Sequence, residues 1–375
     1  MEALASQALD WMIAADWTFE PSLYRGTAGV ALTLLEGARH FGDDRYAPAI
    51  EAAGDALTVA VDDLEDSSLY FGLTGVAVAL RALERDAAAD RALQRVRERF
   101  DGTRWNEMFE LLVGNAGIGL GALHAGDLDL AVLALTPYLR TADPTPGGVN
   151  WAVRPSPPRS HHMAHGTLGI VYALAAVGSA AGRSDMIELA LAGAADVVSR
   201  NEAGPDGFLV PHSDPPHRPE LIERYSLGWC NGPAGDAQAF RLLGSVTGDP
   251  AWAALADRCW RTVTSSGLPE RIRPGFWDNS GHCCGTAGVL ATACDRGDLD
   301  FAGVLVDDLA ARTTVDGTGA RWSNHEHRAT PSELKPETGW AMGSAGIIRE
   351  LLRYSRLRSG GDPSYAVAWP DQLRF

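Results

Sequence analysis

The sequence predicts an all-α fold, a closed α/α toroid built from seven pairs of helices. A Gly-x-x-Gly motif recurs seven times, an apolar stretch rich in Ala and Leu follows the copies, and longer amphipathic stretches separate them. Apolar helices need burial and amphipathic helices belong at a surface, so an inner ring wrapped by an outer ring, about 14 helices together, satisfies both patterns. An open helical solenoid is the alternative.

The seven glycine motifs define the repeat. Their first glycines lie between 42 and 66 residues apart, a spacing typical of folds that repeat a pair of helices. Glycine at a helix start lets backbones pass closely and leaves N–H groups exposed. We therefore expect all seven inner helices to begin at one end of the fold, where the side chains directly before the glycines converge. The motifs are Gly26-Thr27-Ala28-Gly29, Gly72-Leu73-Thr74-Gly75, Gly114-Asn115-Ala116-Gly117, Gly166-Thr167-Leu168-Gly169, Gly232-Pro233-Ala234-Gly235, Gly285-Thr286-Ala287-Gly288 and Gly343-Ser344-Ala345-Gly346.

Each motif opens an inner helix, and the outer helices come from the stretches in between. Ala and Leu after the glycines are strong helix formers. In the intervening stretches apolar residues recur every three or four positions, which is the helical period. The clearest outer helices are predicted at 88–100, 183–200, 251–264 and 299–312.

Three insertions interrupt the repeat, at 141–165, 201–231 and 313–342. They are rich in Pro, Gly and polar residues, and they lead into the fourth, fifth and seventh motifs. Long ordered loops in a compact fold are usually functional. We expect them to form a lid or the wall of a cleft within a single domain that covers residues 1–375.

The charge and cysteine content of the chain disfavour several classes of partner and cellular location. The 375 residues carry a formal net charge of −16, which disfavours a nucleic-acid backbone or an anionic membrane as partner. Residues 1–15 lack the pattern of a signal peptide, and no apolar run is long enough for a membrane span. Five cysteines in this length do not make a disulfide framework, so we expect a reducing, cytoplasmic environment.

Three of the five cysteines stand at equivalent points of the repeat. Cys230 lies just before the fifth motif, and Cys283 and Cys284 lie just before the sixth. Thiolates suit zinc, and three protein ligands with one open position are typical of a catalytic zinc site. Buried cysteines that only pack as small hydrophobic residues are the alternative, which we expect for Cys259 and Cys294. The repeat favours one zinc ion.

The order of these motifs resembles the lanthionine synthetase C-like family over essentially the whole chain. The resemblance rests on seven glycine motifs, Trp229-Cys230-Asn231-Gly232 at the fifth, and Cys283-Cys284-Gly285-Thr286-Ala287-Gly288 at the sixth. It implies an α/α toroid that binds zinc and joins peptide cysteine thiols to dehydroalanine or dehydrobutyrine, forming lanthionine or methyllanthionine rings. A dehydrated precursor peptide would be the substrate, and a separate dehydratase or kinase–lyase the partner.

The same resemblance implies the zinc ligands. They would be Cys230, Cys283 and Cys284. The usual family motif is Cys-His-Gly, whereas a smaller subgroup has Cys-Cys-Gly, and this chain is similar to that subgroup. His282 stands one residue too early to replace a ligand, so we expect it not to bind the metal.

The resemblance also implies an acid–base pair. The family histidine lies directly before the fourth motif, which is His165 here, and Glu110 stands where the family has an aspartate. Addition of a thiolate to a dehydro residue leaves an enolate, which a histidine near neutral pKa can protonate. His165 would donate this proton or accept that of the thiol, and Glu110 would orient its ring.

The resemblance also points to residues that would contact the substrate. Many family members carry an Arg where this chain has Ser226, and Arg224 is the nearby replacement. The residue after the first zinc cysteine is often Tyr or His. His161 and His162 are expected to be solvent-exposed loop residues. The predicted substrate-binding residues are Asn231, Arg224, Asp278, His325, His327 and Arg328.

Two other functions stay open. The chain could add glutathione or another small thiol to dehydroamino acids, as some relatives of the family do. It could instead bind a peptide or a partner synthetase without catalysis, as the departures at Glu110, Ser226 and Asn231 suggest. A toroid fold does not decide between them, because one fold hosts many functions.

Overall fold

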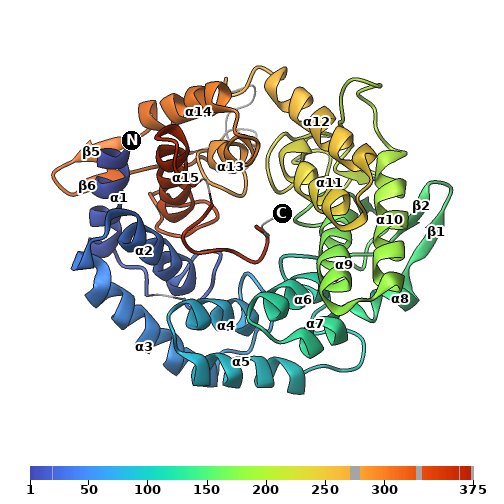
Figure 1. Ribbon diagram of the computed structural model, residues 1–375, viewed down its shortest axis with the longest axis horizontal. Helices are drawn as coiled ribbons and strands as arrows, with labels where there is room; N and C mark the ends of the chain where they lie inside the picture. Colours follow the sequence, from blue (N-terminus) through green and yellow to red (C-terminus); the bar gives the residue numbers. More distant parts are fainter. Residues whose placement is uncertain (19, 271–278, 327–331, 363, 373–375) are drawn as a thin grey trace. The chain divides into compact units, whose positions relative to one another are not determined.

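The computed structural model describes residues 1–18, 20–270, 279–326, 332–362 and 364–372, and these residues form mainly α-helices (Figure 1). Among them, no helix has the length and apolar content needed to cross a membrane. The elements are α1 (Glu2–Ala14), α2 (Thr27–Phe41), α3 (Ala47–Asp63), α4 (Leu73–Ala82), α5 (Asp86–Glu98), α6 (Asn115–His124), α7 (Leu128–Leu135), α8 (Tyr138–Thr141), β1 (Asp143–Thr145), β2 (Gly148–Asn150), β3 (Arg159–Ser160), α9 (Thr167–Ala181), α10 (Ser184–Val198), β4 (Ser213–Asp214), α11 (Pro233–Thr247), α12 (Pro250–Thr264), α13 (Thr286–Arg296), α14 (Leu299–Ala311), β5 (Thr314–Asp316), β6 (Gly319–Arg321) and α15 (Ser344–Arg358), with a 3₁₀ turn at Asp44–Tyr46.

The chain divides into two compact units. Unit 1 comprises the described residues of Met1–Leu64, Ala79–Ala89 and Gly267–Arg374, and unit 2 comprises Glu65–Val78 and Asp90–Ser266. The assignment of residues 1–375 to one domain stays a prediction.

The predicted inner helices are present. Each begins at the residue after the first glycine of its motif, and together they are α2, α4, α6, α9, α11, α13 and α15. Helix α9 is buried continuously from Thr167 to Gly178, as expected of an inner helix. Helix α10, which follows it, buries one face through Met186, Ala190 and Val197. The apolar and amphipathic patterns therefore separated inner from outer helices.

Within each unit the inner helices pack side by side and the helices that follow them form a second layer. In unit 2, α9 packs between α6 and α11, and α7, α10 and α12 cover these three. In unit 1, α15 packs between α13 and α2, which are covered by α14 and α3. The N-terminal helix α1 covers α15, so the first and last helices lie together (Figure 1).

The motif glycines are required by close approach rather than by an unusual backbone angle. Gly232 has φ −171°, which any residue adopts, but a Cβ there would lie 2.4 Å from the carbonyl oxygen of Ser226. A Cβ on Gly235 would lie 1.9 Å from the carbonyl oxygen of Trp229. The loop that leads into the helix therefore presses its carbonyls against the first helical turn, and only glycine leaves room.

Backbone hydrogen bonds link the motifs to one another inside each unit. They join residues that stand two places before the first glycine of adjacent motifs, which we call the −2 positions. In unit 2 the bonds are Tyr70 N–H to Leu112 O (3.2 Å) and Ala164 N–H to Cys230 O (2.9 Å), and in unit 1 they are Cys283 N–H to Ala341 O (2.8 Å) and Ala341 N–H to Tyr24 O (3.0 Å). Side chains at and beside these positions consequently gather at one end of each unit.

The three insertions contain short strands that the sequence did not predict. β1 pairs with β2 and β5 with β6 as hairpins, whose strands are only three residues long. β3 pairs with β4, and this pairing ties the insertion at 141–165 to the one at 201–231. Strands of two or three residues are too short for an alternating apolar pattern to be recognised in the sequence.

The close approach of Gly235 generates a stability prediction. Gly235→Ala should lower the free energy of unfolding by about 1–3 kcal/mol, because the new methyl group has to displace backbone. Gly244→Ala in the same helix is the matched control, since a Cβ there meets no atom nearer than 3.6 Å. It should be neutral or stabilising by up to about 1 kcal/mol. Urea denaturation of both variants checks this, and equal effects would contradict the steric argument.

Candidate functional site

The two adjacent cysteines of unit 1 lie directly before α13. Cys283 is buried and Cys284 is partly exposed, and their sulfur atoms are 3.6 Å apart. That distance is far longer than a disulfide bond. Two thiolates that bind one tetrahedral zinc at about 2.3 Å would be separated by about 3.8 Å. The spacing of the sulfurs therefore fits two ligands of one metal ion.

The loop that carries these cysteines is held by hydrogen bonds from several sides. Tyr24 donates its hydroxyl hydrogen to Cys283 Sγ at 3.5 Å. The Asn279 side chain bonds the backbone of His325 twice, donating to its oxygen at 3.1 Å and accepting its N–H at 2.9 Å. Ser280 N–H bonds the Asn324 side chain at 3.0 Å. A donor on Cys283 Sγ stabilises the thiolate form that a metal ligand requires.

His282 lies in the interior of unit 1. Its Nδ1 is 3.6 Å from Glu350 Oε1, and its ring centroid is 4.5 Å from that of Trp340. Both His282 and Glu350 are fully buried. The imidazole thus lies against Glu350 and Trp340. That it does not bind the metal stays a prediction.

Cys230 occupies the matching −2 position in unit 2. It is buried, and the Asn231 side chain donates to its sulfur at 3.4 Å. Its carbonyl oxygen accepts the N–H of Ala164, which brings the segment before the fourth motif next to the cysteine. Cys230, Cys283 and Cys284 each offer one sulfur that could bind a metal, and none of the three is in a disulfide.

His165 and Glu110 form a hydrogen-bonded pair in unit 2. The distance from His165 Nδ1 to Glu110 Oε2 is 2.9 Å; the Glu110 side chain is fully buried, and that of His165 is 37% exposed. Glu110 also accepts the N–H groups of Leu112 at 3.1 Å and Val113 at 2.8 Å. The carboxylate is therefore held by its own loop, and it fixes the tautomer of His165. With Nδ1 donating, the lone pair of the neutral ring is on Nε2.

The neighbouring histidines correct one expectation. His161 and His162 are buried, not solvent-exposed. Burial, reinforced by the neighbouring His162, lowers the pKa of His161 to about 3. Neither ring nitrogen of His161 has a hydrogen-bond partner among the described residues. The polar appearance of the segment misled the prediction, because burial here comes from the packed insertions.

Two features were missed by sequence reasoning. Tyr24, the donor to Cys283, stands at a −2 position like Cys230 and Cys283, so comparison of the seven motifs could have found it. His162 pairs with Asp236, and no local pattern links these two residues. Only the packing of one repeat on the next brings them together.

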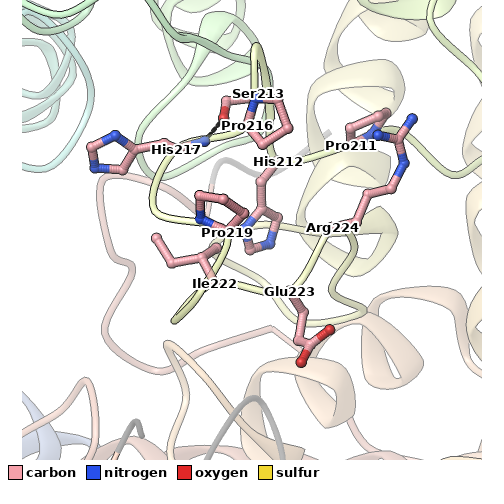
Figure 2. A pocket seen from close by; sticks show the side chains of 9 residues that line it. All are labelled: Pro211, His212, Ser213, Pro216, His217, Pro219, Ile222, Glu223 and Arg224. Atoms are coloured by element: carbon pink, nitrogen blue, oxygen red, sulfur yellow. Dashed lines mark hydrogen bonds between the residues drawn. The ribbon is translucent and has the colours of Figure 1, made fainter.

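The remaining predicted residues are placed as follows. Arg224 is exposed and bonds Glu202 Oε1 at 2.5 Å and the Tyr225 hydroxyl at 2.8 Å. It lines a cavity of about 280 Å³ in the insertion at 201–231, beside prolines and two histidines (Figure 2). His325 contributes its backbone to the bonds with Asn279. Asp278, His327 and Arg328 lie outside the described residues. Substrate binding by these residues stays a prediction.

Comparison with known proteins identifies relatives of the chain. The sequence model described as "Lanthionine synthetase C-like protein" matches residues 18–216 and 216–304. Among solved structures, nisin cyclase matches with a TM-score of 0.65 at 16% identity, covering 92% of this chain and 90% of that one. The GH76A α-1,6-mannanase from Salegentibacter sp. HEL1_6 matches with a TM-score of 0.55 at 11% identity, covering 95% and 99%. No curated protein matches the sequence.

The structural matches concern the fold. They confirm the predicted all-α fold class, the toroid fold of helix pairs shared with nisin cyclase. A mannanase also has a similar fold, so the fold does not select a reaction. The groups that could carry out chemistry are the three thiols and the His165–Glu110 pair.

The buried His161 generates a pH prediction. Its pKa of about 3 in the folded protein lies below the ordinary value of 6.5, so the unfolded chain binds the extra proton. The stability that this neutral ring contributes is present above pH 6.5 and is lost as the pH falls toward 3. Between pH 7 and 4.5 the loss is about 2–3 kcal/mol. His161→Leu should remove that part of the slope in urea denaturation, and parallel slopes would contradict it.

Proposed function

Because the chain belongs to the lanthionine synthetase C-like family, we propose that it is a zinc-dependent lanthipeptide cyclase. It adds cysteine thiols of a dehydrated peptide to dehydroalanine or dehydrobutyrine and closes lanthionine or methyllanthionine rings. The observation that carries the proposal is the His165–Glu110 hydrogen bond of 2.9 Å, on a segment whose Ala164 N–H bonds the carbonyl of Cys230. A proton-transfer pair and a thiol ligand are thereby joined in one unit.

Zinc would be held by Cys230, Cys283 and Cys284. The 3.6 Å between the sulfurs of Cys283 and Cys284 suits two ligands of one ion, and Cys230 stands at the equivalent point of the preceding motif. When bound, zinc lowers the pKa of a coordinated substrate thiol, so that the nucleophilic thiolate is present at neutral pH. Asn231 and Tyr24 donate hydrogen bonds to the ligand sulfurs Cys230 and Cys283 and moderate their negative charge.

His165 is proposed to move the proton. The thiolate sulfur bonds to the β-carbon of the dehydro residue, and the electron pair of the double bond moves toward the carbonyl as an enolate. His165 Nε2 then protonates the α-carbon, having taken the thiol proton, so that ring closure leaves the peptide mass unchanged. Glu110 holds the ring through Nδ1 and stabilises the imidazolium between the two transfers.

The substrate has to arrive dehydrated, so a separate dehydratase or kinase–lyase is the expected partner. Ligand thiols must stay reduced, which supports a cytoplasmic location for the protein. Nisin cyclase, whose fold this chain shares, is named as a cyclase.

The metal site generates the first functional prediction. Protein purified without added metal should contain about one zinc per chain, and each of Cys230→Ala, Cys283→Ala and Cys284→Ala should lose most of it. Cys294→Ala is the matched control, because Cys294 is a buried cysteine within α13 that stands at no motif position. Elemental analysis measures the content. Zinc retained in Cys284→Ala would make His282 a ligand, and zinc absent from folded wild type would favour a non-catalytic binding protein.

The acid–base pair generates the second. With a synthetic peptide that carries one cysteine and one dehydroalanine, His165→Gln should lower the cyclisation rate about 10²–10⁴-fold. Glu110→Gln should have a smaller effect, because it keeps an acceptor for His165 Nδ1. Loss of free thiol and mass spectrometry measure the reaction. An increase in peptide mass when glutathione is supplied would favour the small-thiol reaction, and a His165→Gln rate equal to wild type would refute the assignment.

A further inference from the structure

The segment 161–165, which we call the histidine loop, contacts the region around Cys230 at two points. The first is the backbone bond from Ala164 N–H to Cys230 O, at 2.9 Å. The second is made by His162, whose Nδ1 lies 2.8 Å from Asp236 Oδ2 and 3.0 Å from Oδ1. His165, at the end of the histidine loop, therefore follows two anchored residues.

The hydrogen bonds of His162 define its protonation. Its Nε2 lies 3.2 Å from the carbonyl oxygen of Val210, which can only accept, so Nε2 carries a hydrogen. Nδ1 faces a carboxylate, so one further proton is shared between Nδ1 and Asp236. The pair is neutral overall whether this proton is on the ring or on the carboxyl group. Neutrality lowers the cost of burying both side chains, which are fully inaccessible.

Asp236 is rigidly connected to Cys230. It lies in the first turn of α11, the helix that begins directly after Gly232. Burial raises the pKa of Asp236, and the neighbouring His162 opposes this rise. The bond from Asp236 to His162 therefore links the histidine loop to the helix that begins three residues after Cys230.

We propose that His162 and Asp236 are a positioning pair that sets where His165 stands relative to Cys230. The inference rests on the proposed function, in which His165 transfers a proton beside the thiol ligands. Neither His162 nor Asp236 touches the reacting atoms. A misplacement of about 1 Å at a reacting group costs on the order of a hundredfold in rate, so a second anchor on the histidine loop has a direct catalytic effect.

A purely structural role predicts something different. Two apolar side chains of similar volume would fill the same space with equal or greater stability, because they need no desolvation of polar groups. The polar pair is directional, whereas apolar packing lets the histidine loop shift. The double variant His162→Leu/Asp236→Leu should therefore keep the fold, but His165 should no longer be held in its position relative to Cys230.

The test compares Asp236→Ala with Asp236→Asn and with His161→Leu. Asn keeps the bond, because its amide N–H donates to neutral Nδ1 of His162. His161→Leu is the matched control, since His161 is a buried histidine of the same loop whose ring has no hydrogen-bond partner among the described residues. In protein loaded with Co²⁺ in place of zinc, the paramagnetic shift of the His165 ring protons reports their distance from the metal. Cyclisation of the synthetic peptide is measured in parallel.

Support would be a displaced His165 signal and an about 10–100-fold lower rate in Asp236→Ala and in the double variant, both restored in Asp236→Asn and unchanged in His161→Leu. Melting temperatures show that the variants are folded, and the double variant serves if Asp236→Ala does not fold. A wild-type His165 signal and rate in the folded double variant would overturn the inference while leaving the cyclase proposal intact. Wild-type protein that binds neither Co²⁺ nor zinc would overturn both.

Discussion

The structure depends on the close approach of each inner helix to the loop that precedes it. Carbonyl groups of that loop press on the motif glycines, to within 1.9 Å of where a Cβ would stand at Gly235. The loops are thereby held at the helix starts, where their −2 residues form backbone hydrogen bonds with the adjacent motif. In each unit the helix starts of adjacent repeats therefore lie next to one another, and side chains from different repeats can meet there.

The residues with reactive side chains stand directly before the motif glycines, at positions whose residue type differs between repeats. The bonds at the −2 positions use only backbone atoms, so different side chains can stand there in different motifs. Cysteines occupy them in the fifth and sixth motifs, tyrosine in the first, and His165 follows one in the fourth. A fold that is determined by its backbone packing can carry different side chains at these positions. A cyclase and a mannanase can therefore share it.

Much of the fold could be predicted, because its determinants are local. Seven glycine motifs and the helical period located the starts of the inner helices and distinguished inner from outer helices. The short strands of the insertions were missed, since pairings such as β3 with β4 join segments that carry no strand pattern of their own. The burial of His161 and His162 was missed for the same reason: packed insertions cover a segment that is polar in sequence.

The sequence by itself determined the repeat, the all-α class, the equivalence of Cys230 and Cys283 and the position of His165 before the fourth motif. These depend on spacing along the chain. The resemblance also implied that Glu110 orients His165, and the structure gives this contact as a hydrogen bond. Only the tertiary structure decided that His162 meets Asp236 across 74 residues and that Tyr24 meets Cys283 across 259. Contacts between repeats arise from packing, and no local pattern encodes which residue of one repeat faces which residue of the next.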